Sequence, residues 1–305
     1  MSQAFNLLVI LGPTASGKTK LGVQLAERLN GEIISADSRQ VYRGLDIGSG
    51  KDLEEYNDIP YHLIDIVDPG FEYNLFEFQK HFTLAFKDIS CRQKLPLLVG
   101  GTGMYIDAIV KGYDMVEAPV DPDLRNELNA KTQEELITQL KGLQPGLHNT
   151  TDLEDKDRIV RAIEIALAEK TAQQKAEPYA EKPDVNPLVF GIQWDRDVLR
   201  KRITLRLKDR LEQGMIEEVE GLHAAGVSWD TLAFYGLEYR FLAEHLQGKL
   251  SRNDMFQKLN SGIHKFAKRQ DTWFRKMERK GTNIHWLAGD KDPFAQASSI
   301  LESMR

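Results

Sequence analysis

Short apolar runs alternate with stretches of helical periodicity over the first third of the chain. The runs have the length of buried strands and lie at 5–11, 32–35, 62–67 and 96–99. Between them, apolar residues recur every three to four positions, as on one face of a helix. Such alternation predicts a parallel sheet with helices on its faces.

The pattern changes near Gly112. From there to about residue 185 the apolar positions fit helices, and no run is typical of a strand. Beyond this stretch we expect a strand at 188–192, helices at 197–224, 236–247 and 253–280, and a last short strand at 284–287. The sequence therefore predicts an α/β core formed by residues 1–112 and 186–305, interrupted by a smaller all-helical insertion domain at 113–185.

Two helix starts have the capping-box pattern, a polar residue followed three positions later by a glutamate. Asn74 and Glu77 mark the start of a helix in the core, and Thr132 and Glu135 mark one in the insertion. The insertion has two further helical patterns, at 123–130 and 153–170. The stretch that follows, up to Pro187, is rich in Ala, Gln, Glu, Lys and Pro and predicts a polar linker.

The first apolar run leads directly into a phosphate-binding motif, Gly12-Pro13-Thr14-Ala15-Ser16-Gly17-Lys18-Thr19, which matches GxxxxGK[ST] without a mismatch. The glycines let the backbone turn so that successive N–H groups point at phosphate oxygens. The start of the next helix and Lys18 add positive charge, and the Thr19 hydroxyl can bind Mg²⁺. The core is therefore expected to be P-loop NTPase-like and to bind a di- or triphosphate group with Mg²⁺.

Composition narrows the class of protein. Hydrophobic residues make up 41% of the chain and charged residues 28%, as in an ordinary globular protein. The single cysteine, Cys91, excludes an internal disulfide and a cysteine-based zinc site, which fits a reducing compartment. The first strand begins too early for a signal peptide, and no apolar run is long enough to span a membrane. We expect a cytoplasmic protein with no membrane partner.

The net charge of −6 argues against a nucleic-acid partner, but the distribution of charge does not. Residues 112–185 hold 16 acidic and 9 basic side chains, whereas 196–210 and 264–280 each hold 7 Lys or Arg and only 2 acids. These basic stripes are compatible with a phosphate-backbone partner at one face. Judged on charge alone, two solvated amphipathic helices are the better interpretation.

Polar residues follow two of the predicted strands, where ligands collect in parallel sheets. Asp37 follows the second strand, and Gly100-Gly101-Thr102 follows the fourth. Asp37 could bind Mg²⁺, act as a general base or cap a helix, and the residues alone leave these roles open. Arg202 and Arg206 share a helix face and could clamp a departing phosphate or be solvated.

Eight segments together resemble the tRNA dimethylallyltransferase family. They are GPTASGKT at 12–19, ISADSRQVY at 34–42, YHLIDIVDP at 61–69, LVGGTGMY at 98–105, DPDLR at 121–125, DRIVRAIE at 157–164, RITLRLKDRLEQGMIEEV at 202–219 and AKRQDTWFR at 267–275. Many NTPases share the first segment. The joint occurrence of DSxQVY, LVGGTGxY and KRQxTWFR is far more specific.

The resemblance implies transfer of a dimethylallyl group from dimethylallyl diphosphate to the exocyclic amine of the adenosine 3′ of the anticodon in tRNA. It implies that residues 12–19 cradle the diphosphate, that Asp37 is the general base, and that Lys18, Arg206 and Thr102 are also catalytic. The positions implied to contact tRNA are Asp37, Ser38, Arg39, Gln40, Thr102, Arg125, Asp157, Arg158, Arg161, Lys268, Arg269, Gln270, Trp273 and Arg275. The Trp273–Phe274 pair, taken by itself, is more typical of a helix's buried face.

The chemistry of the residues agrees with these implied roles. An aryl amine is a poor nucleophile, and a carboxylate such as Asp37 that takes its proton raises its reactivity. Backbone N–H groups, Lys18, Arg206 and Mg²⁺ can stabilise the charge that develops on departing diphosphate. The reacting base must leave its stacked loop, so phosphate contacts elsewhere have to offset the unstacking.

The sequence departs from the family pattern in two places. Residues 48–52 read GSGKD where the family usually has GTAKP. Residues 236–239 read GLEY where the family has GYRQ or GYKE, which removes a basic residue that Arg240 could replace.

Three other functions are compatible with parts of the sequence. A P-loop kinase of a nucleoside or small metabolite would explain the phosphate loop and Asp37, but not the basic C-terminal helix. A nucleotide-gated RNA-binding protein would not need an intact Lys18, Thr19 and Asp37. A prenyltransferase of free adenine nucleotides would share the core motifs. For the enzyme acting on tRNA we expect a monomer with no obligate protein partner.

Overall fold

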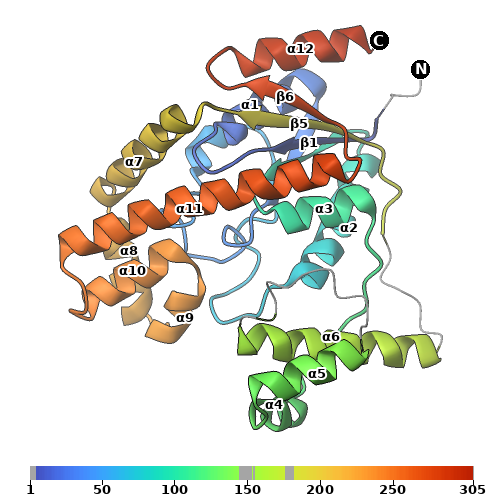
Figure 1. The fold of residues 1–305 in the computed structure, drawn as a ribbon. Helices are drawn as coiled ribbons and strands as arrows, with labels where there is room; N and C mark the ends of the chain where they lie inside the picture. The colour runs from blue at the N-terminus through green and yellow to red at the C-terminus, as the bar shows by residue number, and fades with distance from the viewer. Residues whose placement is uncertain (1–4, 144–152, 154, 176–181, 305) are drawn as a thin grey trace. The chain divides into compact units, whose positions relative to one another are not determined.

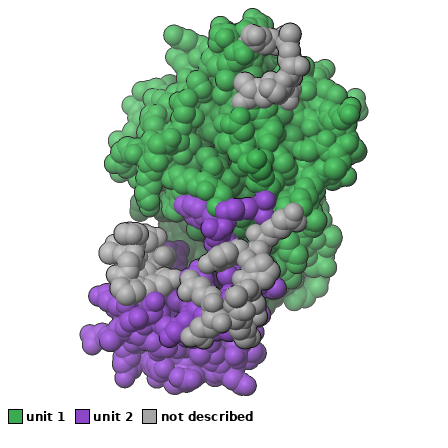
Figure 2. Space-filling view, turned by 90° about the vertical axis from the view of Figure 1, so that its right-hand side faces the viewer, with its two compact units in different colours: residues 1–112, 183–305 green, residues 113–182 purple. Residues whose placement is uncertain are grey.

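The computed structural model describes residues 5–143, 153, 155–175 and 182–304. The chain forms two compact units, one of residues 1–112 and 183–305 and one of residues 113–182 (Figure 2). The larger unit contains a parallel sheet flanked by helices, so the predicted α/β class is confirmed (Figure 1). Among the described residues, no helix combines the length and the apolar character needed to cross a bilayer.

The described residues of the larger unit form six parallel strands, which pair in the order β3-β2-β4-β1-β5-β6. Their bounds are Leu7–Leu11 for β1, Gly31–Ala36 for β2, Tyr61–His62 for β3, Leu95–Gly100 for β4, Pro187–Gln193 for β5 and Ile284–Ala288 for β6. Every residue of β1, β2 and β4 is buried, because helices cover both faces of the sheet. This explains why these strands are continuous apolar runs.

The predicted strand at 62–67 is too long, since β3 ends at His62. Leu63 and Asp65 take positive φ values of 64° and 55°, which interrupt the extended backbone. The chain then bonds to the segment after β2, with the N–H of Ile66 donating to the Val41 carbonyl oxygen at 2.8 Å. The residues after β3 therefore belong to a loop against the core.

Helices pack on the two faces of the sheet in separate cores (Figure 1). One face is covered by α1 (Lys18–Leu29) and α12 (Pro293–Ser303). The other face carries α2 (Leu75–Cys91), α3 (Gly103–Lys111) and α11 (Arg252–Arg279). The Asn74 side chain accepts from the Glu77 N–H at 3.1 Å, which confirms this half of the predicted cap.

The remaining helices of this unit precede α11 in the chain. They are a 3₁₀ turn at Leu53–Tyr56, α7 (Arg196–Glu212), α8 (Met215–Ala224), α9 (Trp229–Phe234) and α10 (Leu237–Leu246). The predicted helix at 197–224 is two helices, because Gly214 at φ 99° breaks the helical backbone. The sequence patterns did not predict α9 or α12.

The smaller unit contains α4 (Pro122–Asn129), α5 (Gln133–Leu143) and α6 (Lys156–Lys175) around a small apolar core. The predicted capping box at Thr132 and Glu135 is confirmed: the Thr132 N–H donates to the Glu135 carboxylate at 2.8 Å, and the Glu135 N–H donates to the Thr132 hydroxyl at 3.4 Å. The first part of the predicted linker is helical, since α6 continues to Lys175, and residues 176–181 lie outside the described residues.

Candidate active site

Three strands end side by side at the edge of the sheet where the polar motifs lie. Gly100, the last residue of β4, is the register partner of Leu11 in β1 and of Ala36 in β2. The phosphate loop, Asp37 and Thr102 follow directly after these strand ends. The sheet therefore brings together three segments that are far apart in sequence.

The phosphate loop has the backbone shape of an anion cradle. Ala15 and Gly17 have positive φ values of 60° and 88°, which turn the chain from β1 into α1. The buried Ser16 hydroxyl lies where a side chain at position 12 would have to be, so Gly12 is needed for this close approach. The Trp194 indole donates to the Ser16 carbonyl oxygen at 3.0 Å and fixes the loop from outside.

Gln270 braces this loop from inside the protein. Its side-chain oxygen accepts from the Thr14 N–H at 2.9 Å, and its side-chain nitrogen donates to the Gly101 carbonyl oxygen at 2.9 Å. The side chain is buried, and both ends of its amide bond to the protein. The family resemblance implied that Gln270 contacts tRNA; the structure places it in the core, as a tie between the phosphate loop and β4.

Asp37 and Thr102 lie on neighbouring segments at this edge. One Asp37 carboxylate oxygen accepts from the Arg39 N–H at 2.9 Å, which orients the side chain. The Thr102 hydroxyl accepts from the Ser38 N–H at 3.2 Å, so it holds the segment that carries Asp37. Asp37 is only partly buried. Its carboxylate is thus oriented by the protein and still within reach of a substrate.

Charged groups gather around the phosphate loop. Burial and, after it, the Arg206 guanidinium lower the pKa of Lys18 to about 8, while the Asp37 carboxylate acts in the opposite direction. Burial also raises the pKa of Glu238, against the opposing effect of Arg210. The site is therefore rich in cations before any anion is bound, as expected of a diphosphate-binding site.

Helix α7 directs two arginines at the loop. One Arg206 nitrogen lies 3.5 Å from the Thr14 hydroxyl, and another contacts Asp52. The Arg202 side chain donates to the Ala15 carbonyl oxygen at 2.9 Å and stacks 4.3 Å above the Trp194 ring. Arg202 thus holds the loop from one side, and Arg206 joins the loop to Asp52.

The predicted tRNA-contacting positions of the larger unit differ in their availability. Lys268 and Arg269 are exposed on α11.

Arg275 donates to the Gln193 side chain at 2.9 Å and stacks 4.2 Å above Trp286. Trp273 packs against Gly103 and the core, as the aromatic pattern of its helix favours. The Gln40 amide donates to the Gly50 carbonyl oxygen at 2.9 Å. Only part of the predicted set is therefore open to a partner.

The other predicted tRNA-contacting positions belong to the smaller unit. Asp157 and Arg158 are exposed in the first turn of α6. Arg125 and Arg161 both donate to the buried Glu164 carboxylate, at 2.8 and 2.7 Å. These hydrogen bonds outweigh burial and keep the pKa of Glu164 below its usual value. The two arginines thus have a structural role in this unit.

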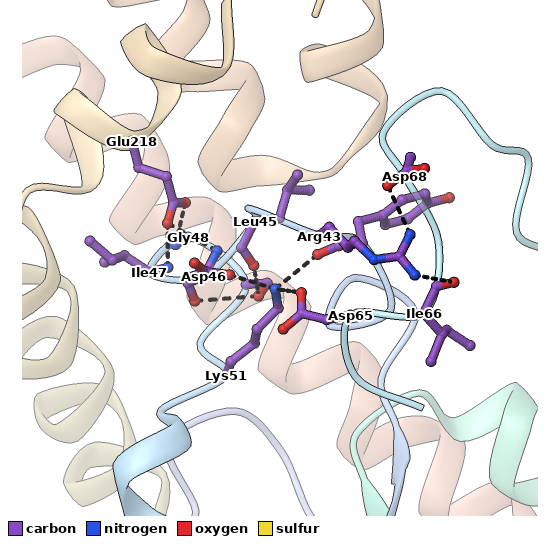
Figure 3. Close-up of polar contacts among 12 residues, drawn as sticks. Arg43, Leu45, Asp46, Ile47, Gly48, Lys51, Asp65, Ile66, Asp68 and Glu218 are labelled. Carbon is purple, nitrogen blue, oxygen red and sulfur yellow. Dashed lines mark hydrogen bonds and ion pairs between the residues drawn. The ribbon is translucent and has the colours of Figure 1, made fainter. Parts of the chain in front are cut away.

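A loop between β2 and β3 is held beside the site by two charged residues (Figure 3). The Glu218 carboxylate accepts from the N–H groups of Asp46, Ile47 and Gly48, at 2.9, 2.6 and 3.1 Å. The buried Lys51 ammonium donates to the Tyr42 carbonyl oxygen at 2.9 Å, to Asp46 at 2.5 Å and to Asp65. Residues 46–51 of this loop are therefore held by Glu218 at their start and by the Lys51 side chain at their end.

We expect Lys51→Met to lower the free energy of unfolding by about 2 kcal/mol, because it leaves the Tyr42 carbonyl without its donor and two carboxylates without their counter-ion. Urea unfolding checks this. Arg43→Met is the matched control, since the Arg43 side chain, which bonds to Asp68 and to the Ile66 carbonyl oxygen, is exposed and water can replace these partners (Figure 3). Equal losses in the two variants would contradict a structural role for Lys51.

Three charged residues at the site were not predicted from the sequence: Asp52, Arg210 and Glu238. Arg210 continues the four-residue spacing of Arg202 and Arg206, and that spacing was a usable signal. Asp52 and Glu238 lie in the two segments that depart from the family pattern, which was the only signal for them.

Comparison with known proteins decides the family. The sequence model described as IPP transferase matches residues 40–277, and a second, described as Isopentenyl transferase, matches residues 5–58. The chain belongs to the IPP transferase family. It is 65% identical over 296 residues to tRNA dimethylallyltransferase 1 of Geotalea uraniireducens, with 97% of each chain covered. It is 62% identical over 301 residues to tRNA dimethylallyltransferase 1 of Geotalea daltonii, covering 99% of this chain and 96% of the relative.

Solved structures of IPP transferase relatives have the same fold. The tRNA isopentenylpyrophosphate transferase of Bacillus halodurans is 34% identical with a TM-score of 0.71, covering 98% of this chain and 95% of that one. A eukaryotic dimethylallyltransferase acting on tRNA has a TM-score of 0.80 at 24% identity, covering 98% of this chain and 80% of that one, and supports the fold alone. The resemblance to the tRNA dimethylallyltransferase family is thus confirmed.

Proposed function

We propose that this IPP transferase moves a dimethylallyl group from dimethylallyl diphosphate to the exocyclic amine of the adenosine 3′ of the anticodon in tRNA. The observation that supports this most strongly is the placement of Asp37 at the same sheet edge as the phosphate loop. The activity named for its relatives agrees with it. No observation favours a kinase, because the activities named for the matching families and relatives are prenyl transfers.

Different residues assist the attack of the amine and the departure of diphosphate. As the amine nitrogen bonds to the allylic carbon, its proton goes to the Asp37 carboxylate. The bond between that carbon and the diphosphate oxygen breaks, and its electron pair leaves with diphosphate. The loop N–H groups, Lys18 and Arg206 stabilise this charge. Thr102 contributes indirectly, because its hydroxyl holds the segment that carries Asp37.

A magnesium ion fits the donors at the start of α1. Thr19 lies in the first turn of that helix, directly after Lys18, and the residue is partly exposed. Together with oxygens of the diphosphate it would hold Mg²⁺, which prefers oxygen ligands and would neutralise charge on the leaving group. Among the described residues, His, Cys, Asp and Glu form no cluster of three that could hold a metal on their own.

The exposed basic residues of α11 form the proposed tRNA surface of the larger unit. We expect Lys268→Ala to weaken tRNA binding several-fold at low salt and to reduce the slope of log affinity against log salt by about 1, since one phosphate contact is lost. Filter binding across a salt series measures both quantities. Lys291→Ala, an exposed lysine before α12, is the control and should change neither. An unchanged slope in Lys268→Ala would remove this residue from the proposed surface.

One assay separates the proposed function from its alternatives. The protein is incubated with Mg²⁺, labelled dimethylallyl diphosphate and either unmodified tRNA or AMP, and separately with ATP and a nucleoside. We expect label on tRNA only. Label on AMP alone would indicate an enzyme of free nucleotides, and phosphate transfer from ATP would indicate a kinase. The cytoplasm is the proposed location, because the tRNA substrate is there.

A further inference from the structure

Arg206 is held at the phosphate loop from two sides. One of its terminal nitrogens faces the Thr14 hydroxyl at 3.5 Å, and the other contacts an oxygen of Asp52. The two contacts use different nitrogens, so the bond to Asp52 leaves the other edge of the guanidinium directed at the loop. Both side chains are partly exposed, 32% for Arg206 and 24% for Asp52. A bound anion could therefore reach Arg206 without displacing Asp52.

A second guanidinium lies behind this pair. Arg210 is 8% exposed, and one of its terminal nitrogens lies 3.5 Å from the same Asp52 oxygen. It packs so closely on Gly50 that a side chain there would overlap the guanidinium, and the φ of 67° at Gly50 is itself unfavourable for other residues. Asp52 thus lies between two arginines, one exposed to the site and one buried.

The position of the Asp52 carboxylate is fixed by its neighbours. It directly follows Lys51, whose side chain is fastened to Tyr42, Asp46 and Asp65 (Figure 3). Burial opposes ionisation of Asp52, but the guanidiniums of Arg206 and Arg210 prevail and lower its pKa. The carboxylate is therefore anionic, and both guanidiniums hold it where it meets Arg206.

The Asp52 carboxylate offsets repulsion among the cations at the phosphate loop. The positive charges of Lys18, Arg206 and Arg210 lie close enough together to repel one another. Arg206 could relieve that repulsion by turning towards water. The Asp52 carboxylate beside Arg206 offsets part of this repulsion. The guanidinium is therefore already in place when diphosphate begins to leave. Groups that need no rearrangement at that moment stabilise the transition state most.

We infer that Asp52 is a positioning residue that holds Arg206 against the phosphate loop, with Arg210 as its buried second partner. Both segments that depart from the family pattern meet here: GSGKD supplies Gly50 and Asp52, and GLEY supplies Glu238, which lines a cavity with Arg206 and Arg210. The inference rests on the proposed function, in which Arg206 acts on the diphosphate.

A double-mutant cycle tests it. The kcat/KM for dimethylallyl diphosphate with unmodified tRNA is measured for the wild type, Asp52→Asn, Arg206→Ala and the double variant. We expect Asp52→Asn to lower kcat/KM about 30-fold, mainly through kcat, but less than about 2-fold when Arg206 is already alanine. Asp52→Glu keeps the charge and should recover most of the loss. Glu54→Gln, an exposed acid in the same turn, is the control and should match the wild type.

The other outcomes are distinguishable. If Arg206→Ala lowers kcat/KM and Asp52→Asn does not, the inference is overturned while the proposed function stands. Equal losses from Asp52→Asn with and without Arg206 would show that Asp52 does not act through that arginine. If Arg206→Ala changes nothing, the role of Arg206 in the proposed function fails, and the inference fails with it. Urea unfolding of each variant separates a loss of fold from a loss of positioning.

Discussion

Replacing Asp37 by asparagine is expected to lower the single-turnover rate by about 10³-fold, because a general base contributes roughly this much. Asparagine has the shape of aspartate and can still accept the Arg39 N–H that orients Asp37. It cannot take a proton from the amine. The acceptor should therefore bind as before, so tRNA affinity should change less than about twofold. Rapid quenching with excess enzyme measures the rate, and filter binding measures the affinity.

The single-turnover rate and the tRNA affinity together distinguish a general base from a binding residue. Asp58→Asn, an exposed residue of the same loop region, is the matched control and should leave both quantities unchanged. A tRNA affinity that falls as far as the rate would mean that Asp37 holds the acceptor and does not activate it. A rate within tenfold of the wild type would mean that another group takes the proton.

Lys18→Met should lower kcat/KM for dimethylallyl diphosphate by about 10²-fold, since removing one donor aimed at developing charge has effects of this size. Methionine keeps the length of the side chain but not its charge. The loop is held by Gln270 and Trp194 independently of Lys18, so the fold should survive. Steady-state kinetics with tRNA in excess gives the value. A loss below threefold would exclude a direct contact between Lys18 and the diphosphate.

The lowered pKa of Lys18 adds a dependence on pH. In the free protein this pKa is about 8, so the ammonium is charged below that pH and loses its proton above it. Donor binding favours the charged form. The affinity for dimethylallyl diphosphate should therefore be constant below about pH 8 and fall up to tenfold per pH unit above it. Lys18→Arg stays charged throughout and should show no such fall. A wild-type affinity that is flat to pH 10 would contradict this.

Much of the fold follows from local pattern because β1, β2 and β4 are buried on both faces and need continuous apolar residues. The register of a parallel sheet also explains why Asp37 and Thr102 could be placed beside the phosphate loop. The strand at 62–67 was overestimated because its apolar residues pack from a loop. The residue types in this stretch do not indicate that Leu63 and Asp65 adopt positive φ values.

The remaining site residues depend on contacts that no local pattern encodes. Gln270 lies in a helix far along the chain, and its role is set by the two backbone groups that it joins. Asp52 meets Arg206 from a loop that Lys51 and Glu218 hold in place. Arg125 and Arg161 look available for RNA in the sequence, yet the buried Glu164 binds both. Burial of such a charge requires partners, which only the structure identifies.

A crystal structure with an anticodon stem-loop and an unreactive analogue of dimethylallyl diphosphate would show whether Asp37 lies at the acceptor amine. We predict the diphosphate in the loop of residues 12–19, and the exocyclic amine of the adenosine 3′ of the anticodon within about 3.2 Å of the Asp37 carboxylate. An amine that lies beyond the reach of Asp37, with the diphosphate in place and the allylic carbon facing another acceptor, would contradict it.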